Sequence, residues 1–210
     1  MIVETEAYSQ EEEACHGYNK KTQSNKILFG EPGRFYIYRS YGIHHCLNIV
    51  TDKDNFASGV LIRAVSISDK NERIAAGPGL VSKAFEVDNK LNSLNVLDNK
   101  FLWVKKGESF VEKKDLIQTT RIGISKAKNI KWRWYLKRSR SISKREKGDR
   151  NPYLKNPNLY LENPKFRNHI YLDNDKFSEY LTNDFNEDFI EEEYAKDLLH
   201  NRMINELFHE

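Results

Sequence analysis

The sequence predicts an α+β protein: a single mixed domain around a curved antiparallel β-sheet, with a protruding β-hairpin and an acidic C-terminal extension. Short runs of aromatic and β-branched residues, separated by turn residues, are typical of antiparallel strands. A chain of 210 residues can bury a core of its own. From about residue 145 Asn-Pro pairs recur, so we expect the domain at 1–145 and a loop-rich extension at 146–210.

The expected elements follow from these runs in chain order. The sequence IVETEAY at 2–8 reads as the first strand, and a polar loop at 9–26 and a turn at 29–33 follow it. Residues 35–50 are expected to form a β-hairpin that bends near Ser40-Tyr41-Gly42. The remaining expected elements are strands at 57–67, 101–107 and 119–125, a short helix after the Gly-Pro-Gly turn within 75–88, and a basic aromatic stretch at 131–144.

The acidic extension ends in a segment with helical periodicity. Two sets of apolar residues recur every four positions: Ile190, Tyr194 and Leu198, and then Leu199, Met203 and Leu207. This spacing predicts an amphipathic C-terminal helix.

Charge is divided unevenly along the chain. Residues 1–150 carry 28 basic and 18 acidic side chains, whereas residues 151–210 carry 6 basic and 13 acidic side chains. A basic body indicates a polyanionic partner, and a soluble protein with a solvating tail is an equally good explanation of charge alone.

Composition also limits the compartment and the oligomeric state that we expect. No apolar run approaches the roughly 18 residues of a membrane span, so we expect no membrane partner. Cys15 and Cys46 are too few for a disulfide framework and are typical of free thiols in the cytoplasm. We expect a monomer.

Candidate chemistry begins in the first strand. Residues alternate along a strand, so Glu4, Glu6 and Tyr8 share one face. That face is either a solvated edge or a working carboxylate set beside an aromatic wall. Arg63 ends the apolar run of a later strand, and a buried guanidinium needs an acceptor. Glu6 and Glu4 are its expected partners, in a structural salt bridge or at a reacting centre.

The hairpin supplies a second candidate. Tyr41 lies next to Gly42 at the bend, so its ring is expected to project from the tip, with Arg39 two residues back. Such a pair suits insertion between bases and contact with a phosphate. The alternative is a tyrosine folded onto its own sheet. A metal site is not expected, because neither Cys15-His16 nor His44-His45-Cys46 has the spacing of metal ligands.

Several blocks, taken in order, resemble the alkyladenine-type 3-methyladenine DNA glycosylases. The blocks are IVETEAY, ACH, FGEPGRFYIYRSYGIHHCLNIV, GVLIRA, GPG, RIGIS and WRWY, and they cover about residues 2–144. The resemblance implies a DNA repair enzyme that hydrolyses the N-glycosidic bond of alkylated or deaminated purines in duplex DNA, without metal or redox cofactor. It also implies a barrel like the C-terminal domain of formyltransferases.

The resemblance implies roles for individual residues. Glu6 corresponds to the base that activates water, and Arg63 to an arginine near that water and the backbone. The residues that correspond to contacts with the damaged base are Tyr8, His16, Tyr38 and Asn48. Of these, Asn48 corresponds to the side chain that crowds the 2-amino group of normal guanine. Tyr41 corresponds to the wedge that replaces the extruded nucleotide. Contacts to the DNA backbone are expected from Arg39, Gly77, Gly79 and Lys83, and Glu4 is a weaker candidate for orientation.

Two other functions remain open at this point. A catalytically impaired, truncated DNA-binding module would keep the wedge and the basic surface, and family members carry residues before the strand at 2–8. A nucleic-acid-binding barrel related to methionyl-tRNA formyltransferase would not need Glu6. No lysine stands at the matched cage positions, so we expect a monofunctional glycosylase without Schiff-base chemistry.

Overall fold

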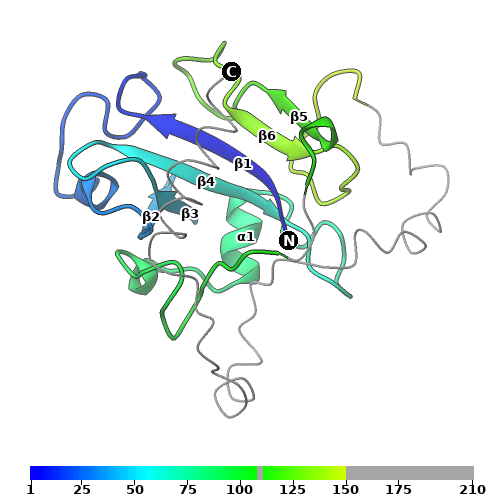
Figure 1. Ribbon diagram of the computed structural model, residues 1–210, viewed down its shortest axis with the longest axis horizontal. Helices are drawn as coiled ribbons and strands as arrows, with labels where there is room; N and C mark the ends of the chain where they lie inside the picture. The colour runs from blue at the N-terminus through cyan, green and yellow to red at the C-terminus, as the bar shows by residue number, and fades with distance from the viewer. Residues whose placement is uncertain (108–110, 150–210) are drawn as a thin grey trace.

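Six strands form one antiparallel sheet in the order β2-β3-β4-β1-β6-β5 (Figure 1). The computed structural model describes residues 1–107 and 111–149. Within them the fold is mixed α+β, as expected, with few helical segments. The strands are β1 Ile2–Ser9, β2 Phe35–Ser40, β3 His44–Val50, β4 Ser58–Val65, β5 Leu116–Thr119 and β6 Arg133–Leu136.

Within the described residues, one α-helix and three short 3₁₀ segments accompany the sheet. The helix α1 Pro78–Ala84 begins with Pro78 in its first turn and packs against β3 and β4. Proline suits this place, because its fixed φ is helical and its missing N–H has no partner there anyway. The 3₁₀ segments are η1 Lys26–Phe29, η2 Asn89–Leu91 and η3 Lys113–Asp115.

The two faces of the sheet carry different side chains. On one face the apolar residues of β2, β3 and β4 bury themselves against α1 and the segment after it, in a cluster that includes Phe35, Leu47, Ile62, Val81 and Phe85. Each fully buried side chain of this size contributes about 1.5–3 kcal/mol. The opposite face carries the polar and aromatic residues expected for the site, so the core holds the sheet that positions them.

A register irregularity lies between β1 and β4. Glu4 pairs with Ala64 while Thr5 pairs with Ile62, which leaves Arg63 without a partner in the ladder. An extra residue of this kind bends a strand. Arg63 shares its face of β4 with Gly59 and Leu61, as strand alternation requires, and contacts Glu4 and Glu6 on β1.

The strand predicted at 2–8, the hairpin and the strand predicted at 57–67 are confirmed, and so is the short helix after the Gly-Pro-Gly turn. Two predicted strands are wrong. Residues 101–107 form no strand, because their apolar run reflects the burial of Leu102 in the core. At 119–125 the strand has already ended, since β5 stops at Thr119 and the chain turns at Gly123 with a φ of 78°.

Three expectations are not decided by the fold. The C-terminal helix and most of the extension at 146–210 lie outside the described residues. The boundary at 145 and the likeness to a formyltransferase barrel stay predictions. In the part of the chain that the structure describes, no helix combines the length and the apolar character that crossing a membrane requires.

Candidate active site

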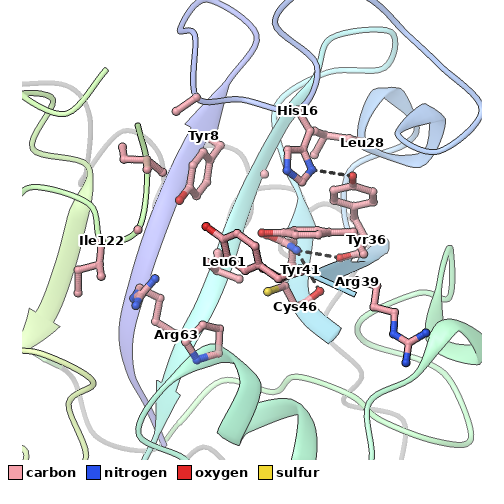
Figure 2. A pocket seen from close by; sticks show the side chains of 18 residues that line it. Tyr8, His16, Leu28, Tyr36, Arg39, Tyr41, Cys46, Leu61, Arg63 and Ile122 are labelled. Carbon is pink, nitrogen blue, oxygen red and sulfur yellow. Dashed lines mark hydrogen bonds between the residues drawn. The ribbon is translucent and has the colours of Figure 1, made fainter. Parts of the chain in front are cut away.

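A pocket of about 470 Å³ opens on the polar face of the sheet (Figure 2). This volume lies within the range of small-molecule sites, roughly 300–1,000 Å³. The predicted site residues that border it come from strands β1 to β4, the loop after β1 and the hairpin tip: Tyr8, His16, Tyr38, Arg39, Tyr41, Asn48 and Arg63. Residues from four strands and two loops therefore converge on one cavity.

Glu6 lies beneath this pocket and is completely enclosed, with 0% of its surface exposed. One carboxylate oxygen, Oε2, accepts hydrogen bonds from the Tyr8 phenol at 2.9 Å and from Nη1 of Arg63 at 3.1 Å. The other, Oε1, accepts the backbone N–H of Ile122 at 2.7 Å. Three donors, one of them charged, favour a carboxylate that carries its negative charge.

Glu4 extends the same buried network away from the pocket. Its Oε1 accepts a hydrogen bond from Nη1 of Arg133 at 2.8 Å. The same oxygen lies 3.4 Å from Nε of Arg63, which forms an ion pair with it but no hydrogen bond. Ser143 donates to Glu4 from both its backbone N–H and its hydroxyl. The expected partnership of Arg63 with Glu6 and Glu4 is confirmed. Glu4 does not border the pocket, and its expected role in orientation stays a prediction.

Aromatic rings form the walls of the pocket. Tyr8 stands on one side and His16 on the other (Figure 2). The His16 ring packs edge-on against Tyr38, with 4.3 Å between ring centroids, and its Nδ1 shares a 3.0 Å hydrogen bond with the Tyr36 hydroxyl. These contacts hold the imidazole in one orientation, with Tyr36 as its support.

Burial sets the protonation states of these walls. It lowers the pKa of His16 below its ordinary 6.5, which favours the neutral imidazole at neutral pH. Burial and then the charge of Glu6 raise the pKa of Tyr8, and burial raises the pKa of Tyr38. The rings are therefore uncharged and electron-rich, a combination that attracts a cationic base through cation–π contacts.

Asn48 forms part of the pocket lining from β3 and is held by the backbone. Its Nδ2 donates to the carbonyl oxygens of Tyr36 at 3.0 Å and Cys46 at 3.2 Å. The two bonds define which end of the amide is nitrogen. The side chain is only 5% exposed and has little room to move. It can therefore act as a fixed steric element of the wall.

The hairpin tip presents an exposed tyrosine at the mouth of the pocket. Tyr41 is 90% exposed, and its backbone adopts a left-handed conformation with a φ of 49°. Gly42 follows with a φ of 68°, so the tight bend demands this conformation at both positions. For a residue other than glycine it costs roughly 1–2 kcal/mol. The ring does not fold back onto the sheet, so the alternative of a packed tyrosine is wrong.

The expected backbone contacts lie beside the hairpin. Gly77 and Gly79 flank Pro78 at the start of α1. Lys83 is exposed on that helix and borders a second hollow of the surface, which His44 also lines. A Cβ on Gly79 would meet Cγ of His44 at 2.9 Å, so only glycine permits this close approach. Arg39 is exposed at the rim of the pocket. Of these four residues, Arg39 borders the pocket itself, and Gly79 and Lys83 border a second, neighbouring hollow.

Sequence reasoning missed two contributors to the site. Tyr36 supports His16, and strand alternation had already placed it on the same face as Tyr38, which was the available signal. The N–H of Ile122 donates a hydrogen bond to Glu6 from a loop 116 positions away, and no local sequence pattern predicts such a contact.

Comparisons with known proteins identify the class. A model of the methylpurine-DNA glycosylase (MPG) family matches residues 1–140. The chain is 40% identical over 158 residues to the "Putative 3-methyladenine DNA glycosylase" of Synechococcus sp. (strain JA-3-3Ab), a match that covers 68% of this chain and 81% of the relative. A protein of the same name from Trichodesmium erythraeum (strain IMS101) is 40% identical over 160 residues, covering 68% and 80%.

A more distant relative of that name, from Francisella tularensis subsp. tularensis (strain SCHU S4 / Schu 4), is 33% identical over 157 residues and covers 69% of this chain and 81% of its own length. The protein is thus a DNA glycosylase by class. More particularly, the chain belongs to the methylpurine-DNA glycosylase family. The resemblance found in the sequence is confirmed.

Proposed function

We propose that this protein excises alkylated or deaminated purines, of the 3-methyladenine and hypoxanthine class, from double-stranded DNA. The observation that carries the proposal is the Glu6 carboxylate, held by three donors directly beneath an aromatic pocket. The names of the 3-methyladenine DNA glycosylase relatives agree with this substrate class.

The target base enters the pocket by leaving the duplex. A base inside the stack is out of reach, and its extrusion costs a few kcal/mol, least for a damaged or mispaired base. Tyr41 fills the vacancy, as the exposure of its ring at the mouth of the pocket favours. Arg39 and Lys83, with the backbone at Gly77 and Gly79, contact the flanking phosphates.

The extruded base is recognised by its faces and one edge. It stacks between Tyr8 and His16, against Tyr38, where a cationic alkylpurine gains about 1–2 kcal/mol once it is desolvated. Asn48 lies where it crowds the 2-amino group of guanine and so disfavours the normal base. Its rigid hydrogen bonds support this steric role.

Glu6 activates the water that attacks the anomeric carbon of the sugar. A C–O bond forms there, the N-glycosidic bond breaks, the base departs with its electron pair, and Glu6 takes the proton of the water. The negative charge of the carboxylate also stabilises oxocarbenium character on the sugar. Glu6 has no exposed surface in the free protein, so the entering nucleotide must open a path for this water to the carboxylate.

The product is an abasic site, because the reaction is hydrolysis alone. Bond cleavage through a Schiff base needs an amine nucleophile. The pocket lining within residues 1–107 and 111–149 contains arginine but no lysine, which supports a monofunctional enzyme.

A second candidate is a DNA-binding module of the same family with impaired catalysis. The complete enclosure of Glu6 favours it, because a general base must reach the water that it activates. Such a protein would keep the exposed Tyr41 and the cations around the pocket.

One assay separates the two candidates. The protein is incubated with duplexes containing 3-methyladenine, 7-methylguanine, hypoxanthine or undamaged purines, and released base and alkali-labile sites are both measured. The enzyme should release damaged purines and leave strands that break only after alkali. Tight binding of lesion duplexes without any release of base would instead establish the binding module.

A further inference from the structure

Arg121 and Glu12 form a buried ion pair directly behind the pocket. The two guanidinium nitrogens Nη1 and Nη2 contact the carboxylate oxygens of Glu12 at 2.7 and 2.9 Å. The side chains are 0% and 5% exposed, and neither residue borders the pocket. A buried pair of this kind carries a large desolvation cost and is weak evidence for stability by itself. Its contacts indicate another role.

Arg121 reaches the strand that carries Glu6 and Tyr8. Its Nη1 donates to the carbonyl oxygen of Ala7 at 2.9 Å, and its guanidinium lies over the Tyr8 ring, 4.6 Å from the centroid. The centroid of the Trp132 ring lies 5.5 Å from the same guanidinium. Because Arg121 has no exposure and does not border the pocket, it covers the face of Tyr8 that the base does not use.

Arg121 is also the residue directly before Ile122, whose N–H binds Glu6. Glu12 in turn organises the loop that carries His16, since its Oε2 accepts the N–H of Ala14, itself part of the pocket lining. One ion pair thus joins β1, the His16 loop and the loop at 120–124. These are three of the segments that build the pocket, and the loop at 120–124 lies more than 100 residues after the other two.

We infer that Arg121, fixed by Glu12, is a positioning residue of this pocket: it holds the Tyr8 ring and the Ile122 amide in place against Glu6. This inference rests on the proposed function of the pocket. Lysine cannot replace arginine here, because an ammonium group lacks the planar array of N–H donors with which the guanidinium binds the Glu12 carboxylate and the Ala7 carbonyl at the same time.

The charge of Arg121 has a consequence for specificity. A cation on one face of an aromatic ring withdraws electron density from the other face and repels a second cation stacked there. Tyr8 therefore attracts a cationic alkylpurine less than a tyrosine without Arg121 would. Removing the charge should shift preference from neutral hypoxanthine toward cationic 7-methylguanine by about threefold or more, given the usual strength of cation–π contacts.

The test compares Arg121→Lys, the double variant Glu12→Gln/Arg121→Gln, and Arg145→Gln as the matched control. The double variant avoids an unpaired buried charge, and Arg145 pairs with Asp149 outside the pocket. Single-turnover excision of hypoxanthine by Arg121→Lys should fall about tenfold to a hundredfold, the usual effect of a small misplacement. Affinity for the lesion duplex should change little. The double variant should show the shift toward 7-methylguanine.

A second readout needs no activity. The protection of the Ile122 amide against hydrogen exchange, corrected for the sequence change next to it, reports its bond to Glu6. It should fall in both Arg121 variants and not in Arg145→Gln. Folded Arg121 variants with unchanged protection of Ile122 and wild-type rates on both lesions would overturn the inference. Absence of excision by the wild type would refute the proposed function, and the amide protection would still decide the positioning role.

Discussion

The phenol of Tyr8 donates a hydrogen bond to Oε2 of Glu6 at 2.9 Å, from a position two residues further along the same strand. The alternation of β1 places both side chains on one face of the sheet. The ring that borders the pocket is therefore also a direct partner of the buried carboxylate. In the proposed function, this contact couples base recognition to the activation of water.

Replacement of Tyr8 should separate these two roles. Tyr8→Phe keeps the ring but leaves a buried carboxylate with one donor fewer, so the free energy of unfolding should fall by about 1–3 kcal/mol. Lesion binding should be retained in Tyr8→Phe and lost in Tyr8→Ala, which removes the stacking face. Urea unfolding and fluorescence-anisotropy titrations measure the two effects. Equal lesion affinity of the two variants would contradict the stacking role.

Tyr41 should affect DNA rather than folding. Tyr41→Ser should weaken extrusion of the lesion, seen as a smaller fluorescence increase of 2-aminopurine placed beside it, because no ring fills the vacancy. Tyr18→Ser is the control, since Tyr18 is also exposed, at 42%, and does not border the pocket. An unchanged signal and affinity in Tyr41→Ser would exclude the wedge.

The left-handed backbone at Tyr41 gives an independent prediction about stability. Tyr41→Gly removes the steric cost of a φ of 49° but adds flexibility to the unfolded chain. The free energy of unfolding should therefore be unchanged or higher, by up to about 1 kcal/mol, although the variant loses the wedge. Thermal unfolding by calorimetry checks this, and a clear loss of stability would show that the Tyr41 ring is needed for folding.

The Glu4 network should matter for stability. Glu4→Gln leaves the buried guanidinium groups of Arg63 and Arg133 with too little negative charge, at a cost of about 3–5 kcal/mol. The exposed pair of Glu31 and Arg34 provides the control: Glu31→Gln should cost at most about 1 kcal/mol. Urea unfolding compares the two variants. A similar decrease in the free energy of unfolding for both variants would show that the buried network contributes no more to stability than an exposed ion pair.

Binding should depend on pH through His16. Burial lowers the pKa of His16 below 6.5, so the imidazole is neutral at pH 7 and protonates only as the pH falls below that value. Stability and affinity for a cationic 7-methylguanine duplex should then decrease together, because the charged imidazole is desolvated and repels the base. The His16→Asn variant should lose this dependence. An NMR titration of His16 with a midpoint above 6.5 would contradict the assignment.

The sequence allowed prediction of those parts of the site that lie on regular strands. Alternation placed Glu6 with Tyr8, and the need of a buried guanidinium for acceptors gave Arg63 its partners. The turn at Gly42 located the exposed tip. In each case the geometry depends on residues close in the chain, or on one rule about burial.

The remaining parts depend on contacts between distant residues. The apolar run at 101–107 resembles a strand, but Leu102 is buried in the core and Val104 packs against it without any strand there. Strand β5 ends at Thr119, and two residues later Arg121 pairs with Glu12, a partner 109 positions away. Trp134 and Tyr135 are buried in β6, within a stretch that the sequence marked only as basic and aromatic. Tertiary contacts decided these elements, and local pattern could not reveal them.

The central claim is that the Glu6 carboxylate activates the attacking water. It is tested most directly by single-turnover excision from a hypoxanthine duplex by the wild type and by Glu6→Gln, with duplex affinity measured in parallel. The amide keeps the size of the side chain and removes the base, so release should fall at least a thousandfold while affinity is retained. Release by Glu6→Gln at the wild-type rate would contradict the account.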